Sequence, residues 1–137
     1  MEIKLKSKEQ VVSSESIKNI LGEILKSEDP LDQEKEHFWA IGLDAQNHIK
    51  YIDLVHLGAI NQCPCHVMEI YRRACIKGIV SLIVAHNHPS GNPQPSREDI
   101  RATEKLKQAG DILGIKLLDH VIIADNSYYS FCDDNNL

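Results

Sequence analysis

The sequence lacks the features of a membrane or secreted protein. None of its apolar runs approaches the roughly 20 residues that span a bilayer, so we expect a soluble protein with no membrane partner. The N-terminal stretch MEIKLKSKEQ alternates charged and apolar residues, and it has neither the apolar core nor the small-residue cleavage site of a secretory signal. The predicted compartment is therefore the cytoplasm.

The sequence also lacks an excess of basic residues. It has 15 Lys and Arg against 20 Asp and Glu, which gives a formal net charge of -5 at pH 7. Non-specific binding to nucleic acid draws its affinity from many Lys and Arg contacts to phosphate. The composition therefore argues against direct nucleic-acid binding.

Cysteine is scarce, and its spacing is not that of a zinc finger. The four cysteines are Cys63, Cys65, Cys75 and Cys132. We expect free thiols and no disulfides in a reducing compartment. The stretch Cys-Pro-Cys-His at residues 63–66 has no second ligand pair at finger-like spacing, so loop or buried thiols are favoured over a metal role there.

The length and the hydrophobic pattern fit one α/β domain. The 137 residues suffice for one hydrophobic core, so we expect a single domain over residues 1–137, with residues 1–30 as an N-terminal strand and helix extension. Helical periodicity predicts helices over residues 14–26 (capped by Ser13 or Ser14), from about residue 66 to Gly78, and from Ser96 to near Gly110. Residues 27–36 are polar and predict a connector. Strands are predicted over residues 37–44 and 48–58 as a hairpin, and over 78–85, 115–124 and 128–131.

This order, α-β-β-α-β-α-β-β, predicts a mixed β-sheet flanked by helices, in a two-layer or three-layer sandwich. The strand at 78–85 is almost wholly apolar, as expected for a central strand covered on both faces. The residues expected in the core are Ile41, Leu43, Ile70, Ala74, Leu82, Val84, Leu106 and Ile122.

The segment HNHPSGNPQPSREDI, residues 86–100, is the part of the sequence that indicates chemistry. His86 and His88 follow the predicted strand at an i, i+2 spacing, so both imidazoles can reach one ion at about 2.0–2.1 Å. The Pro/Gly-rich loop at residues 89–95 can return Asp99 to the same point. Two histidines and one carboxylate form a hydrolytic zinc set, which leaves a fourth position for a water whose pKa falls towards about 7.

Other interpretations of this segment are simpler. The histidines could be polar surface residues, and Ser96 with Asp99 forms an S-x-x-D pattern that can cap a helix. Capping does not explain two histidines beside a buried strand, so the metal site is favoured. An HNH nuclease is disfavoured, because that class spreads its residues over a ββα-metal unit.

The motif H-x-H-P, six residues, then S-x-x-D resembles the JAMM zinc motif of the JAB/MPN metalloprotease superfamily. The stretches EHFWAIGLD, AHNHPSGNPQPSREDI, LDHVIIAD and YYSF resemble, more closely, its RadC-like branch, over about residues 36–131. The resemblance implies a cytidine-deaminase-like three-layer fold and hydrolysis of peptide or isopeptide bonds at a single zinc. The branch is named for DNA repair, which suggests a link to repair or mobile elements.

Carried over to this sequence, the resemblance implies that His86, His88 and Asp99 bind Zn²⁺. It implies that Ser96 donates a hydrogen bond to the tetrahedral intermediate.

The family also requires an upstream glutamate that holds the water and moves its proton. Glu36 is the best positional match, Glu69 is the alternative and Glu34 is less favoured. Glu36 could instead be a surface residue of the charged run EKE.

Two departures from the family pattern affect the predicted function. Only a short helix precedes Glu36, where RadC-like proteins usually carry a DNA-binding helix-hairpin-helix region, and Val67 and Met68 replace a common Pro-Arg.

From the motif and the resemblance together, we expect a zinc hydrolase that acts on a peptide or protein substrate. The alternative is a non-catalytic zinc protein that serves as an interaction module in DNA repair.

Overall fold

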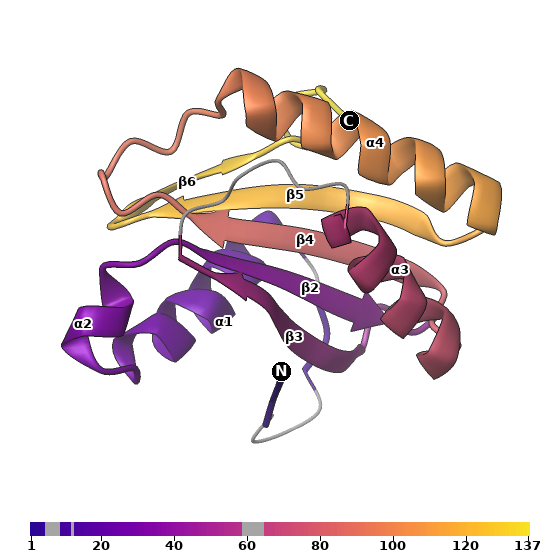
Figure 1. Ribbon diagram of the computed structural model, residues 1–137, viewed down its shortest axis with the longest axis horizontal. Helices are drawn as coiled ribbons and strands as arrows, with labels where there is room; N and C mark the ends of the chain where they lie inside the picture. Colours follow the sequence, from indigo (N-terminus) through magenta and orange to yellow (C-terminus); the bar gives the residue numbers. More distant parts are fainter. Residues whose placement is uncertain (5–8, 12, 59–64) are drawn as a thin grey trace.

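The computed structural model describes residues 1–4, 9–11, 13–58 and 65–137, with residues 65 and 66 described by their backbone alone (Figure 1). Its elements, in chain order, are β1 (Glu2–Ile3), α1 (Ser14–Lys26), α2 (Pro30–Gln33), β2 (His37–Leu43), β3 (Ile49–Leu57), α3 (Cys65–Lys77), β4 (Ser81–Asn87), α4 (Arg97–Leu113), β5 (Lys116–Ala124) and β6 (Ser127–Ser130). Within the described ranges, no helix is long and apolar enough to cross a membrane.

All six strands belong to one mixed sheet, in the order β1-β3-β2-β4-β5-β6. β4 and β5 pair in parallel, and the other neighbouring pairs are antiparallel. The prediction that the hairpin, the histidine-bearing strand and the two C-terminal strands share one sheet is therefore confirmed. The sheet order places β4 in the interior, with β2 on one side and β5 on the other.

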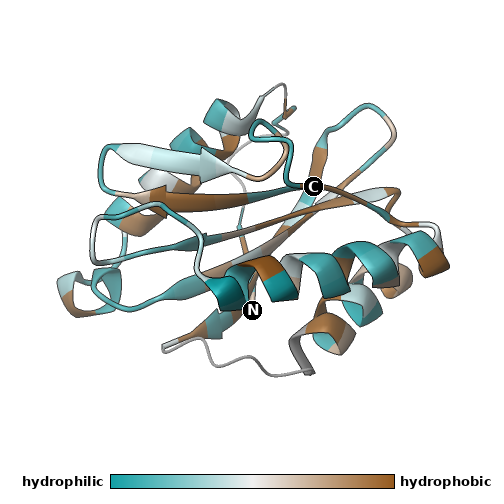
Figure 2. Ribbon diagram, turned by 90° about the horizontal axis from the view of Figure 1, so that it is seen from above, coloured by the Kyte–Doolittle hydropathy of each residue, from teal (hydrophilic) through white to brown (hydrophobic). Residues whose placement is uncertain are grey.

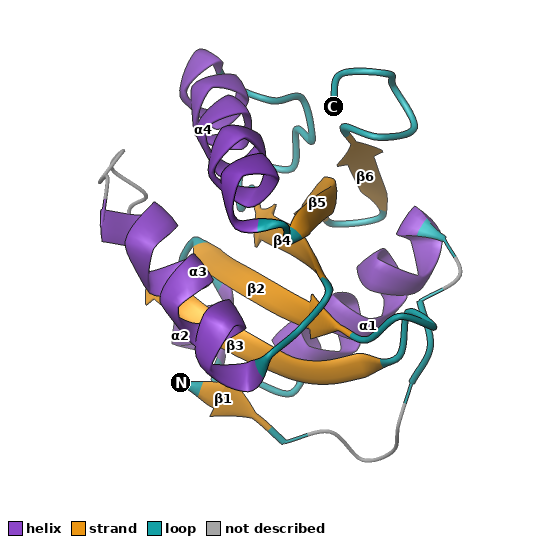
Figure 3. Cartoon of the chain, turned by 90° about the vertical axis from the view of Figure 1, so that its right-hand side faces the viewer, coloured by secondary structure: helices purple, strands orange, loops and turns teal. Residues whose placement is uncertain are grey.

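Helices cover both faces of the sheet, so the architecture has three layers and the two-layer alternative is wrong. Figure 3 shows α3 and α4 on one face and α1 on the other. Each face has its own hydrophobic cluster: Trp39 and Ile41 belong to the cluster under α1, and Phe38 and Ala40 to the cluster under α3 and α4. Figure 2 shows hydrophobic residues along the strands of the sheet and a mixture of hydrophilic and hydrophobic residues along the helices.

The predicted core is confirmed. All eight of its residues are at most 2% exposed: Ile41, Leu43, Ile70, Ala74, Leu82, Val84, Leu106 and Ile122. The predicted helix at residues 14–26 is also confirmed, and its cap is Ser13, whose side chain accepts a hydrogen bond from the backbone N–H of Ser16. A serine oxygen at this position satisfies one of the amides that have no partner inside the helix.

The structure differs from the sequence-based prediction mainly at β4, at the polar connector and at the end of α4. β4 begins at Ser81, later than expected, and runs through Asn87, so His86 lies inside the strand. The polar connector contains the short helix α2, which has a proline in its first turn. Helix α4 does not end near Gly110 but continues to Leu113, and Gly114 caps it with a left-handed φ of 76°.

The cysteine predictions divide between described and undescribed residues. Cys75 and Cys132 are free thiols, as expected. The thiols of Cys63 and Cys65 lie outside the described part of the chain.

Gly110 serves close packing rather than helix termination. A Cβ at this position would press against the carbonyl oxygen of Ile115 and lie 2.7 Å from the hydroxyl of Tyr71 on α3. That hydroxyl donates a 2.6 Å hydrogen bond to the carbonyl of Leu106, which holds the tyrosine ring close to α4. The absence of a side chain therefore allows α3 and the end of α4 to approach each other.

We expect Gly110→Ala to lower the free energy of unfolding by about 1–3 kcal/mol, because the added methyl group overpacks a closed contact. Gly22→Ala is the matched control: it lies in α1, and apart from its chain neighbours and the backbone of its own helix, no described heavy atom lies within 4 Å of an added Cβ. There the gain in helix propensity should raise the free energy of unfolding by about 0.5–1 kcal/mol. Urea denaturation of both variants measures the difference, and an equal effect on both would contradict the packing role of Gly110.

Candidate metal centre

The candidate centre lies at the C-terminal end of β4. β2 runs antiparallel to β4, with Phe38 opposite His86, so the start of β2 lies beside the end of β4. Beyond β4 the chain passes through a proline-rich loop and enters α4 at Arg97, on the face of the sheet that carries the His86 side chain. The start of β2, the end of β4 and the start of α4 therefore meet at one end of the strands, in the interior of the sheet order.

His86, His88 and Asp99 come together as the sequence predicts. One ligand atom from each lies within 4.8 Å of the others. The Nε2 atoms of His86 and His88 are 2.9 Å apart, and they lie 3.4 Å and 3.3 Å from the carboxylate oxygens of Asp99. Ligand atoms around a tetrahedral zinc, each about 2.0–2.1 Å from the ion, are themselves about 3.3 Å apart. The donor types and their spacing therefore fit a zinc ion.

Ser96 and Asp99 also form a capping box at the start of α4. The backbone N–H of Asp99 donates to Oγ of Ser96 at 3.0 Å, and the backbone N–H of Ser96 donates to Oδ2 of Asp99 at 2.9 Å. The capping interpretation and the metal interpretation are therefore compatible, because the box holds the carboxylate of Asp99 next to both imidazoles. The Ser96 side chain is exposed at the rim of the centre.

His88 is oriented by a backbone carbonyl in the proline-rich loop. Its Nδ1 lies 2.8 Å from the carbonyl oxygen of Asn92. A carbonyl oxygen can only accept, so Nδ1 of His88 carries a proton, and in the neutral ring Nε2 presents a lone pair to the centre. The loop therefore supplies the orientation that a metal ligand requires.

Opposite charge shifts the pKa values of the two partly exposed ligands. The hydrogen bond with Asp99 is the main cause that raises the pKa of His88, and burial opposes it; the charge of Glu36 is a further cause that raises it. Burial alone would raise the pKa of Asp99, but the interactions with His86 and His88 and the N–H of Ser96 hold it well below its usual range. The centre therefore favours positive charge.

Glu36 is placed at this end of the strands by Asn87. The backbone N–H of His37 donates to Oδ1 of Asn87 at 2.5 Å, and Nδ2 of Asn87 donates to the carbonyl of Lys35 at 3.1 Å. These two bonds fix the residues on either side of Glu36, whose side chain is half-buried. The alternative Glu69 is exposed on α3 and pairs with Arg72 at 2.5 Å.

Four contributing residues were not predicted as part of the site: Asn87, Asn92, Thr103 and His120. His120 lies on β5, with its Nε2 atom 2.7 Å from Nδ1 of His86, and it is fully buried. Its signal in the sequence is a histidine that precedes the apolar run of residues 121–124 in β5, and such a histidine is more often a satisfied core residue than a site residue. Asn87 has a similar signal, as a polar residue at the end of a buried strand.

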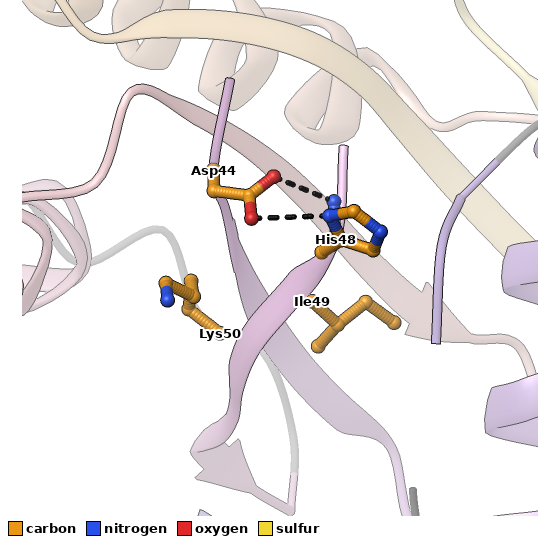
Figure 4. A pocket seen from close by; sticks show the side chains of 4 residues that line it. All are labelled: Asp44, His48, Ile49 and Lys50. Atoms are coloured by element: carbon orange, nitrogen blue, oxygen red, sulfur yellow. Dashed lines mark hydrogen bonds and ion pairs between the residues drawn. The ribbon is translucent and has the colours of Figure 1, made fainter. Parts of the chain in front are cut away.

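A separate pocket lies at the other end of the sheet, at the turn between β2 and β3 (Figure 4). It is lined by Asp44, His48, Ile49 and Lys50. The carboxylate of Asp44 accepts hydrogen bonds from the backbone N–H groups of Gln46 and His48, and it lies 3.2 Å from Nδ1 of His48. Asp44 is therefore committed to the turn, and this pocket is distinct from the metal centre.

The fold and the site together define a three-layer α/β domain with a candidate metal centre of two histidines and one aspartate. A family model described as "RadC-like JAB domain" matches residues 11–137. The chain therefore belongs to the RadC-like JAB domain family. The match begins well before Glu36, so it includes α1 as well as the motif-bearing strands.

Curated relatives carry the same family relationship. The chain is similar to a "UPF0758 protein" of Desulforudis audaxviator, with 43% identity over 97 residues (71% of this chain, 42% of the relative). A "UPF0758 protein" of Geotalea uraniireducens is 45% identical over 102 residues (74% and 45%). One from Caldanaerobacter subterraneus is 40% identical over 129 residues (88% and 53%). The chain spans about half the length of these relatives.

We expect the charge of Asp99 to stabilise the metal-free protein in a defined pH window. Its lowered pKa means that this stability is present above the unfolded pKa of about 4 and is lost as the pH falls. The pKa of His88 is raised in the folded state, so the stability that comes from its positive charge is fully present below about pH 6.5 and is lost as the pH rises through the folded pKa. Asp99→Asn, which keeps an oxygen for the capping box, should therefore cost more stability near about pH 5.5 than near about pH 8.5.

Urea denaturation of the wild type and Asp99→Asn after removal of metal by EDTA measures this difference. A penalty that is equal at both pH values, or larger at the alkaline one, would show that the ion pair with His88 does not stabilise the folded state.

Proposed function

We propose that this chain is a zinc-dependent hydrolase that cleaves peptide or isopeptide bonds. The observation that carries the proposal is the convergence of two imidazole Nε2 atoms and one carboxylate at the end of β4. Membership of the RadC-like JAB domain family supports the same chemistry, since the JAMM motif that this sequence resembles belongs to zinc peptidases.

The donor set favours zinc over other common ions. Imidazole nitrogen with a single carboxylate suits Zn²⁺, whereas Mg²⁺ and Ca²⁺ prefer sites built mainly from oxygen. Three protein ligands leave one position for water, and zinc would supply the chemistry of lowering the pKa of that water towards about 7. Asp99 and His88 are 13% and 15% exposed at their side chains, so water and substrate can reach the centre.

Glu36 is the proposed general base. Asn87 fixes the backbone on both sides of it beside the end of β4, and the charge of Glu36 is one of the causes that raise the pKa of His88. In the proposed reaction Glu36 takes a proton from the attacking water as the water oxygen bonds to the carbonyl carbon. It then passes the proton to the departing amine nitrogen as the C–N bond breaks.

Ser96 is the proposed oxyanion donor. Its oxygen already accepts the N–H of Asp99, so its own hydroxyl proton is available to a partner outside the capping box. The residue is exposed at the rim, where a substrate carbonyl would approach. A hydrogen bond that forms as negative charge develops on the carbonyl oxygen would lower the barrier.

Glu36→Gln separates catalysis from metal binding. We expect it to retain zinc and the fold while hydrolysis falls by about 10²- to 10⁴-fold, because the amide has the shape of the carboxylate but cannot accept the proton. The measurements are zinc content by elemental analysis and the cleavage rate of internally quenched peptides and an isopeptide-linked conjugate. Glu69→Gln is the matched control and should leave the rate unchanged.

Other outcomes of this experiment are equally informative. Loss of activity in Glu69→Gln with retention in Glu36→Gln would transfer the role of base to Glu69. A wild-type protein that binds zinc but cleaves none of the substrates would favour a structural zinc. Absence of zinc from the wild type would contradict the proposed function.

A further inference from the structure

A chain of buried hydrogen bonds runs behind the candidate centre. Nδ1 of His86 lies 2.7 Å from Nε2 of His120, and Nδ1 of His120 lies 2.6 Å from Oγ1 of Thr103. The hydroxyl of Thr103 donates to the backbone carbonyl of Asp99 at 2.7 Å. The three side chains are at most 2% exposed. This series of hydrogen bonds, called the relay below, therefore begins at the side chain of the proposed ligand His86 and ends at the backbone carbonyl of the proposed ligand Asp99.

The last acceptor fixes the direction of the chain at Thr103. The carbonyl oxygen of Asp99 can only accept, so the single hydroxyl proton of Thr103 is committed to it. Oγ1 of Thr103 must then accept from its other neighbour, which places a proton on Nδ1 of His120.

The next hydrogen bond of the relay joins the buried ring of His120 to His86. Its ring is fully buried, stacks on Phe131 at 4.8 Å between ring centroids, and meets the ring of Phe38 edge-on. Nε2 of His86 faces Nε2 of His88 and the carboxylate of Asp99, which is the direction in which a metal ligand presents its lone pair. The proton of the neutral His86 ring then lies on Nδ1, so Nδ1 of His86 donates to Nε2 of His120.

We propose that Thr103 and His120 are positioning residues that hold His86 in the tautomer with its proton on Nδ1 and its Nε2 lone pair directed at the metal centre. This inference rests on the metal centre of the proposed function but not on hydrolysis. Most metal-ligating histidines donate their second N–H to a carboxylate, a carbonyl or water. Here the acceptor of the His86 N–H is the buried His120, which is itself held by Thr103 and, through it, by the carbonyl of Asp99 on α4.

The relay also couples the two ligands that come from different elements. His86 is on β4 and Asp99 is on α4, and the relay joins them through β5 and through the helix that carries Asp99. A change that breaks the relay therefore acts on metal affinity without removing any ligand. Thr103 allows this test, because valine has its shape without the hydroxyl and serine keeps the hydroxyl.

We expect Thr103→Val to weaken zinc binding by about 10- to 100-fold, the range found for changes in contacts that support metal ligands. Thr103→Ser should bind within about threefold of the wild type, since it retains the donor and the acceptor. Competition with a chromophoric zinc chelator measures both affinities in the full chain. Equal affinity of the wild type and Thr103→Val would overturn the proposal.

The tautomers provide a second readout that needs no variant and no activity. Nitrogen NMR of the wild-type imidazoles should show Nδ1 protonated in both His86 and His120, with and without zinc. A proton on Nε2 of neutral His120, or an unprotonated Nδ1 of His86, would overturn the proposal even if Thr103→Val fails to fold. Failure of the wild type to bind zinc would contradict the proposed function, whereas the tautomer measurement on the metal-free protein would still decide the relay.

Discussion

The structure of the site depends on one electrostatic constraint: two imidazole nitrogens and one carboxylate face a common point. Nε2 of His86, Nε2 of His88 and the carboxylate of Asp99 lie within 3.4 Å of one another. Lone pairs at this distance repel unless positive charge lies between or on them. The hydrogen bond with Asp99 is the main cause that raises the pKa of His88, so the cluster favours positive charge. A divalent cation would supply it with better geometry, and for this reason we interpret the cluster as a metal centre rather than as polar surface.

The fold holds these three side chains in place because each has a second hydrogen bond outside the cluster. His88 donates to the carbonyl of Asn92, His86 is backed by His120, and Asp99 is held by the amide of Ser96. The parallel pairing of β4 with β5 brings His120 beside His86, and the antiparallel pairing of β4 with β2 brings the Glu36 segment to the same end of the strands. The sheet topology therefore determines which groups surround the cluster, while the capping box of α4 determines the position of the third ligand.

Hydrophobic patterns are sufficient to predict the fold because α1 and α4 bury one face at helical spacing, whereas β2 and β4 are continuous apolar strands that are buried at every position. Ile41, Val84 and Leu106 can be assigned to the core on this basis, and the H-x-H and S-x-x-D spacings locate the candidate ligands because local geometry alone brings each pair together. Gly110 was misassigned because a glycine that permits close approach of α3 looks the same in sequence as one that ends a helix. The relay from Thr103 to His86 was not predictable, because its contacts join residues 17 and 34 positions apart with no local pattern.

X-ray absorption spectroscopy at the zinc edge of the loaded protein tests the central assignment most directly. Ligation by His86, His88 and Asp99 predicts a first shell of nitrogen and oxygen at about 2.0–2.1 Å, with the multiple-scattering pattern of two imidazole rings. Sulfur scattering at about 2.3 Å would instead place the metal on cysteine, with residues 63–66 as the first candidates. A sulfur shell, or a shell with no imidazole signal, would contradict the assignment of the metal centre to the end of β4.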